Sequence, residues 1–158
     1  MDTPREEPQN RETAPRFEFR EFTISELAYK LSLDLRNAYL RAPLGLDLSE
    51  QDTSGEDQQL HFGLFEDPNI LASVTLKPLD NDRLKLRQMV VDQSTRGCGL
   101  GRVLITKAEH ILRERGYKQI TLSARLEVKS FYEKLGYKRN GARFLLIGIE
   151  HVTMDKEL

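Results

Sequence analysis

The residues with the clearest potential for chemistry form a glycine-rich stretch in the second half of the chain, Arg96-Gly97-Cys98-Gly99-Leu100-Gly101. An apolar run typical of a strand ends just before it, and a helical pattern of apolar residues begins with it. Glycines let a backbone approach a ligand closely, and the first turn of a helix offers unpaired amides at the positive end of the dipole. This arrangement favours a phosphate group as ligand.

The spacing of the glycines separates this loop from two common nucleotide-binding loops. A Walker loop ends in Lys followed by Ser or Thr, and here the residue after Gly101 is Arg102. A Rossmann fingerprint reads G-x-G-x-x-G and follows the first strand of a βαβ unit, whereas this loop reads G-x-G-x-G and follows the fourth predicted strand. A nucleotide-binding domain is therefore a minor alternative, and a tight turn without a ligand is the other interpretation of the loop by itself.

The elements that must position the loop follow from hydrophobic periodicity. Alternation from Arg16 predicts a strand with Phe17 and Phe19 inward, and Thr23 with Glu26 resembles a capping box at the start of a helix. Residues 44–59 predict a loop or a short irregular helix on the substrate side. Strands are expected over residues 60–65, 70–76, 84–91, 119–124, 137–139 and 151–154, and helices over residues 24–41, 100–115 and 128–135. The order β-α-β-β-β-α-β-α-β-β indicates an α/β fold.

Charge and composition restrict the partners. The 24 Lys and Arg residues against 25 Asp and Glu residues leave a net charge of -1, which predicts no nucleic-acid partner and no binding to an acidic membrane surface. Cys98 is the only cysteine, and no apolar run reaches the ~20 residues of a membrane helix. We therefore expect a cytoplasmic protein, with a loose tail over residues 1–15 and one domain over residues 16–158.

Two motifs in register carry a family resemblance. Arg96-x-x-Gly99-x-Gly101 resembles the R/Q-x-x-G-x-G/A signature of the GNAT N-acetyltransferase superfamily. Ser130-Phe131-Tyr132-Glu133-Lys134-Leu135-Gly136-Tyr137 resembles the second conserved block of that superfamily, and the interval between the blocks fits one helix and one strand. Gly148-Ile149-Glu150-His151-Val152-Thr153-Met154 is similar to the ending of its ElaA-like branch. The resemblance implies a central, twisted, mostly antiparallel sheet flanked by helices.

The resemblance also implies acetyl-CoA as co-substrate, with no metal. Backbone groups of Met89, Val90 and Val91, on a bulged strand, would meet its pantetheine arm. Arg125 stands where the family usually has an Asn that reaches the pantetheine arm, and an Arg there could contact the phosphates of the cofactor or seal the site differently. Arg125 and Phe131 are further candidate contacts. The residues whose amides would surround the pyrophosphate are Arg96, Gly97, Cys98, Gly99, Leu100, Gly101 and Arg102. The Cys98 thiol is not expected to react, because the sequence places no His beside it.

Three catalytic roles have to be filled for acetyl transfer to an amine. By the resemblance, the amide of Val91 would stabilise the oxyanion and Tyr132 would be the acid for the leaving thiolate; an aromatic residue of the core is the alternative interpretation of Tyr132. The base is harder to assign, because residues 84–91 contain no acidic residue. His61 and His151 are the candidates on chemical grounds, with a structural histidine as the favoured alternative for each, and Glu50 is a weaker candidate.

The function predicted from these features is transfer of the acetyl group of acetyl-CoA to a primary amine of a small molecule or peptide. The alternative is a module that binds acetyl-CoA as a sensor without turnover, which requires the glycine loop but not Tyr132. The family resemblance also admits a homodimer.

Overall fold

The computed structural model describes residues 17–95 and 97–158. The predicted tail, Arg16 and Arg96 lie outside this part of the chain. Within it the elements are β1 (Glu18–Phe22), α2 (Leu27–Arg36), the π-helix η1 (Asn37–Arg41), η2 (Ala42–Leu44), α3 (Glu50–Thr53), η3 (Glu56–Gln58), β2 (Leu60–Glu66), β3 (Asn69–Pro78), β4 (Arg83–Val91), η4 (Gln93–Thr95), α4 (Leu100–Glu114), β5 (Gln119–Arg125), η5 (Leu126–Val128), α5 (Lys129–Lys134), β6 (Lys138–Arg139), β7 (Phe144–Leu146) and β8 (Ile149–Glu157).

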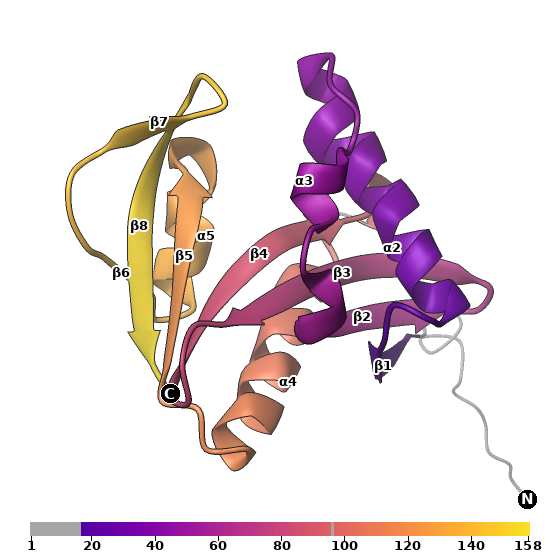
Figure 1. Cartoon of the computed structure of the whole chain (residues 1–158), viewed down its shortest axis with the longest axis horizontal. Helices are drawn as coiled ribbons and strands as arrows, with labels where there is room; N and C mark the ends of the chain where they lie inside the picture. Colours follow the sequence, from indigo (N-terminus) through magenta and orange to yellow (C-terminus); the bar gives the residue numbers. More distant parts are fainter. Residues whose placement is uncertain (1–16, 96) are drawn as a thin grey trace, which may run out of the picture.

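The strands form one mixed sheet in the order β1-β2-β3-β4-β5-β8-β6, with β7 paired to β8. All pairs are antiparallel except β4 with β5. Helix α4 lies on one face of the sheet and α2 on the other (Figure 1). The predicted α/β class with a mostly antiparallel sheet flanked by helices is confirmed.

Each helix covers its own apolar cluster. Leu100, Leu104 and Leu112 of α4 are buried against sheet residues that include Leu84 and Leu122. On the opposite face α2 covers a smaller cluster that includes Leu35, Phe65 and Val90. No helix among residues 17–95 and 97–158 is long and apolar enough to cross a membrane.

The sheet opens in its middle. β4 and β5 pair only from Arg83 with Gln119 to Leu86 with Leu122. Beyond these pairs the two strands separate, and Figure 1 shows β5 and β8 diverging from the end of β4. The backbone groups on the facing edges of the two strands are consequently left without a strand partner.

A β-bulge reinforces this opening. The register between β3 and β4 shifts between Ser73 and Thr75, so that one residue of β3 opposes two of β4. Gln88 lies at the bulge with φ +54, a value that is uncommon for residues other than glycine. The bulge implied by the family resemblance is therefore present.

The N-terminal predictions need correction. Phe17 lies outside β1 and is exposed, whereas Phe22 is buried. The amide of Thr23 bonds the Glu26 carboxylate at 2.7 Å, but this pair forms a turn before the helix, which begins only at Leu27. Leu27 is itself 71% exposed. Part of the apolar pattern read as helical therefore lies at the surface.

A buried charged network ties α2 to β4. Glu56 accepts two hydrogen bonds from Arg36, at 2.9 and 2.8 Å, and one each from Tyr29 and Arg87, at 2.7 and 3.0 Å. Glu56 and Arg36 are both 1% exposed. Arg36 also reaches Gln88 at 3.4 Å, so the network extends to the bulge. Burial alone would raise the pKa of the Glu56 carboxyl, but the bonds from Arg36 and Tyr29 outweigh it and the pKa lies below its usual value.

The first prediction concerns this network. Replacing Glu56 by Gln leaves two arginines partly or wholly buried without their counterion, so we expect a loss of about 3–5 kcal/mol in the free energy of unfolding. Urea denaturation measures it, with the exposed Glu50→Gln as control, expected within about 0.5 kcal/mol of the wild type. A loss below about 1 kcal/mol in Glu56→Gln contradicts the prediction.

The lowered pKa of Glu56 gives this contribution a pH dependence. The carboxylate stabilises the fold fully above its unfolded pKa of about 4.3, and the contribution is lost as the pH falls through the lower, folded value. The difference in stability between the wild type and Glu56→Gln should therefore shrink on acidification.

The second prediction concerns the hairpin between β7 and β8. Leu146 pairs with Ile149, and the two residues of the turn, Ile147 and Gly148, have φ +47 and +74. Such a turn favours Asn-Gly, and a β-branched residue is strained there. We expect Ile147→Asn to raise the free energy of unfolding by about 0.5–1 kcal/mol in the same urea experiment. Leu145→Asn, an exposed change on the adjoining strand, should give no gain in the free energy of unfolding. An equal gain in both variants would show that the conformation of the turn is not the cause.

Candidate active site

One cavity of about 810 Å³ occupies the opening between β4 and β5. This volume suits a ligand of cofactor size. The wall is contributed by the glycine loop, β4, β5, α5, η1 and the β7–β8 hairpin. Its lining residues are Tyr39, Leu40, Arg41, Lys85, Leu86, Arg87, Gln88, Met89, Val90, Val91, Thr95, Gly97, Gly99, Leu100, Gly101, Arg102, Leu122, Ser123, Ala124, Arg125, Glu127, Val128, Phe131, Tyr132, Leu146, Ile147 and His151.

The glycine loop presents backbone at one end of the cavity. Gly97 and Gly99 have φ +87 and +73, and Gly99 is the N-cap of α4. The first helical bond of α4 runs from the amide of Val103 to the carbonyl of Gly99, so the preceding amides of the first turn are free to bind a ligand. Cys98 is exposed, and Arg96 cannot be placed because it lies outside the described residues.

A glycine is favoured at position 101 because neighbouring side chains lie close to it, and not because its backbone has a positive φ. A Cβ there would lie 3.2 Å from the Phe131 ring and 3.3 Å from Cε of Met89. Met89 and Phe131 therefore meet the first turn of α4 side by side. Three of the predicted cofactor contacts, from the loop, β4 and α5, therefore share one wall of the cavity. Cys98 does not line the cavity, and its amide donates to the carbonyl of Thr95 at 3.3 Å, so it is not available to a pyrophosphate.

The backbone of β4 offers a donor to the gap. The amide of Asp92 donates to the carbonyl of Leu71 on β3 at 2.7 Å. Because successive amides of a strand point to opposite sides, the amide of Val91, which opposes Ala72, points away from β3 and toward the separated β5. It is available to an oxyanion held between the strands.

Tyr132 reaches the cavity from α5. Its ring is 6% exposed and packs edge-to-face on Phe131 and Tyr137, with centroids 5.0 and 5.6 Å away. Burial raises the pKa of the Tyr132 phenol, which keeps it protonated at neutral pH. It combines both interpretations made from the sequence, an aromatic residue of the core and a hydroxyl at a cavity.

His151 also lines the cavity. Its Nδ1 lies 2.7 Å from the carbonyl of Ile149, which can only accept, so Nδ1 carries the proton. In the neutral ring Nε2 is then an acceptor, and no hydrogen bond occupies it within residues 17–95 and 97–158. Phe144 stacks on the ring at 5.9 Å and fixes its plane. The geometry is that of a base held in one tautomer.

The structure does not support the other two candidates for the base. His61 is buried on β2 outside the cavity, with Nε2 2.8 Å from the carbonyl of Glu56 and Nδ1 3.0 Å from the hydroxyl of Thr75. Burial lowers the pKa of His61, and both nitrogens are occupied, so its role is structural. Glu50 is exposed at the start of α3 and does not line the cavity.

Arg125 lies in the cavity, but on the side of η1 and α2. Its Nη2 lies 3.4 Å from the carbonyl of Leu40 in η1, on the side of the sheet covered by α2. It therefore lies away from the glycine loop, in the opposite half of the cavity. This position favours sealing of the site over a contact with the phosphates of the cofactor.

Sequence reasoning missed the basic residues of the site. Arg41, Lys85 and Arg87 all line the cavity. The alternation Leu84-Lys85-Leu86-Arg87 already contained the signal for two of them, because it places both basic side chains on the face of β4 opposite the buried leucines. Among the described residues no group of three or more His, Cys, Asp or Glu side chains could hold a metal ion.

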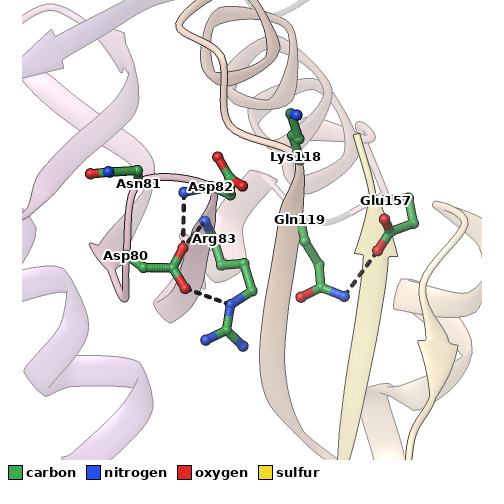
Figure 2. A pocket seen from close by; sticks show the side chains of 7 residues that line it. All are labelled: Asp80, Asn81, Asp82, Arg83, Lys118, Gln119 and Glu157. Atoms are coloured by element: carbon green, nitrogen blue, oxygen red, sulfur yellow. Dashed lines mark hydrogen bonds and ion pairs between the residues drawn. The ribbon is translucent and has the colours of Figure 1, made fainter.

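A second hollow lies at the other end of the sheet, where β4 and β5 begin (Figure 2). Its polar groups bind each other: the Asp80 carboxylate accepts bonds of 2.8 Å from the amides of Asp82 and Arg83 and from Nε of Arg83. Gln119 donates to Glu157 at 2.9 Å. These bonds account for a stabilised turn and leave no converging set of free donors.

Comparison with known sequences matches the chain to proteins of Bacillus subtilis. It is 28% identical over 142 residues to YitI of Bacillus subtilis (strain 168), an uncharacterised N-acetyltransferase, which covers 85% of this chain and 95% of that protein. It is 38% identical over 73 residues to another candidate acetyltransferase of that strain, BSU40680; this match covers 46% of the chain and half, 50%, of that protein's length.

Solved structures share the fold. A candidate N-acetyltransferase from Lactobacillus plantarum superposes with a TM-score of 0.82 at 23% identity, covering 91% of this chain and 99% of that one. ElaA of Escherichia coli gives 0.74 at 21% identity, covering 90% and 100%. A GNAT family acetyltransferase from Elizabethkingia anophelis, with acetyl-CoA bound in its crystal, gives 0.69 at 14% identity, covering 90% and 98%.

A family profile described as "Acetyltransferase (GNAT) domain" matches residues 47–158, which include β4, the glycine loop, α5 and β8. The profile thus covers most of the cavity, and the family resemblance and the assignment to an acetyltransferase are confirmed. The chain belongs to the GNAT acetyltransferase family.

Proposed function

We propose that this protein, as one GNAT domain over residues 16–158, transfers the acetyl group of acetyl-CoA to a primary amine of a small molecule or peptide by direct attack. The observation that carries the proposal is a single cavity that joins the amides of the glycine loop, through the opening between β4 and β5, to the free nitrogen of His151. Acetyl-CoA and the amine can therefore meet inside the protein.

Backbone groups of the protein provide most of the proposed binding site for the co-substrate. The free amides of the first turn of α4 suit a pyrophosphate, since they combine donors with the positive end of the helix dipole. The wall made by Gly101, Met89 and Phe131 leaves little room for a side chain at position 101, because a Cβ there would lie 3.2 Å from the Phe131 ring and 3.3 Å from Cε of Met89. When bound, acetyl-CoA supplies a thioester carbonyl that becomes a tetrahedral oxyanion on attack by the amine. The residues around it then have three tasks.

Val91 offers its amide to the oxyanion, because this amide points into the gap between β4 and β5. His151 Nε2 takes the proton that the amine loses, since Nδ1 is held as a donor by Ile149. Tyr132 remains protonated and gives a hydrogen bond, then its proton, to the sulfur as the thiolate leaves. One proton leaves nitrogen and one reaches sulfur, so the reaction is balanced.

The third prediction tests the binding of the co-substrate. In Gly101→Val the added methyl groups meet Met89 and Phe131 and distort the wall that receives acetyl-CoA. We expect millimolar acetyl-CoA to raise the Tm of the wild type by several degrees and to leave the Tm of the variant unchanged. Thr106→Val, an exposed change on the same helix, should behave as the wild type. Absence of a shift in the wild type would refute the proposed function.

The fourth prediction tests the acid. Tyr132→Phe removes the hydroxyl but keeps the packed ring, so we expect turnover to fall about 100-fold while the Kd for acetyl-CoA changes less than about threefold. Release of the thiol with a panel of amines measures turnover, and calorimetry measures affinity. Tyr117→Phe serves as the control. Equal turnover in Tyr132→Phe and the wild type excludes the acid role, and binding without release from any amine favours the sensor.

A further inference from the structure

The cavity has two halves that lie on opposite faces of the sheet. On β5, Leu122 and Ala124 point into the cluster covered by α4, so Ser123 and Arg125 point to the other face. The same alternation on β4 places Leu86 toward α4 and Lys85 with Arg87 toward α2. We call the residues on the α2 side the acceptor half: Arg41, Lys85, Arg87, Ser123, Arg125 and His151.

The contacts of these side chains agree with the assignment to the α2 side. Arg87 reaches Glu56 in η3, and Arg125 reaches Leu40 in η1. The glycine loop, Met89 and Phe131 lie on the other side, with α4 and α5. The co-substrate and the acceptor would therefore enter from opposite faces and meet where the strands separate.

The acceptor half is strongly positive. It contains four basic side chains and no acidic one; Glu127, the only carboxylate that lines the cavity among the described residues, is exposed in η5. Two of the four basic side chains have a counterion nearby: Arg41 pairs with Asp52 at 2.9 Å, and Arg87 lies 3.0 Å from Glu56, a carboxylate that it shares with Arg36.

The other two charges have no counterion in the part of the chain that the structure describes. Lys85 and Arg125 are both half-buried, and Arg125 has a single long hydrogen bond, to the carbonyl of Leu40. Holding an unpaired cation away from bulk water is unfavourable, and an anion bound beside it removes that cost. The planar guanidinium of Arg125 can bind two oxygens of such an anion at once.

We propose that the amine acetylated by this protein also carries an oxyanion group, a carboxylate or a phosphate, that binds Arg125 with support from Lys85. The inference rests on the proposed function. Arg125 is directly opposite His151 in the β5–β8 pairing, which brings their Cβ atoms to about 5 Å. An oxyanion at Arg125 therefore holds an amine a few bonds away close to Nε2 of His151. Polycationic acceptors such as polyamines and aminoglycosides would instead meet repulsion from Lys85 and Arg125.

The experiment compares matched acceptors with the full chain and saturating acetyl-CoA. Each amino acid is paired with its amide, phosphoethanolamine with ethanolamine, and putrescine represents the polycations. We expect kcat/KM at least tenfold higher for the anionic member of a pair, and the preferred anion decides between carboxylate and phosphate. The amine of an amino acid amide has a lower pKa than the amine of the amino acid itself, so a larger fraction of it is unprotonated at a given pH. A preference for the amino acid therefore cannot result from a higher concentration of the reactive, unprotonated amine.

Variants assign the effect to Arg125. Arg125→Gln should lower kcat/KM for the anionic acceptor about 10- to 100-fold, and this loss should exceed that for its neutral partner at least tenfold. Arg125→Lys should recover part of the loss because it keeps the charge. Lys107→Gln, which removes an exposed charge on α4, is the control. Equal losses for both members of a pair, or a preference for amides or putrescine, overturn the inference.

A binding measurement separates this inference from the proposed function. Calorimetry on the CoA-loaded protein compares N-acetylated acids with the corresponding N-acetylated amides, which needs no turnover. Binding of the acid that is lost in Arg125→Gln supports the anion site even if no amine is acetylated. Absence of both turnover and Arg125-dependent binding overturns the anion site, while a missing thermal shift with acetyl-CoA is a failure of the proposed function.

Discussion

The whole site depends on the point at which β4 and β5 stop pairing. After Leu86 and Leu122 the facing edges carry amides and carbonyls that the sheet no longer satisfies. Leaving such a group unpaired away from water costs about 1–3 kcal/mol, so the gap is stable only if water or a ligand with its own hydrogen-bonding groups enters it. An extended arm with amide groups, such as pantetheine, matches this need. The proposed function therefore makes the opening between the strands a binding site built from backbone, which needs few fixed side chains.

Strands β4 and β5 are each held in place by contacts on the side that does not face the gap. β5 pairs with β8 along its whole length, from Gln119 with Glu157 to Arg125 with His151, so it cannot turn toward β4. β4 is bent by the bulge at Gln88 and tied to α2 through Arg87, Glu56 and Arg36. A buried ion network is a poor substitute for apolar packing as a source of stability, but it fixes the position of its members because a displaced charge would lose its partners. The same network adds to the positive charge of the acceptor half, because Arg87 belongs to both and shares the single carboxylate of Glu56 with Arg36.

Sequence reasoning succeeded where a local pattern carried the signal. The helical period of Leu100, Leu104 and Leu112 gave α4 nearly to its ends, and the glycines before it were correctly placed at the strand-to-helix turn. It failed where the signal was a contact between distant residues. Arg36 and Glu56 were not singled out from the sequence, because no local pattern shows that they are buried together. His61 and His151 are the same residue type on two strands, and they differ only in whether Nε2 is already occupied, which depends on tertiary structure. The hairpin at Ile147 was missed because Ile is the wrong residue for such a turn.

The alternation of β5 couples the two halves of the site. Leu122 and Ala124 belong to the apolar cluster under α4, while Ser123 and Arg125 face the acceptor half, so one strand of seven residues contributes to both. A slip of one residue would bury Arg125 among leucines and expose Leu122 and Ala124 to the acceptor, and the burial of the apolar face forbids that slip. Substitutions on the outward face can therefore change the acceptor without disturbing the core. The proposed function assigns the co-substrate mainly to backbone groups and the acceptor to outward side chains, so it makes the binding of the two ligands separable at the level of single residues.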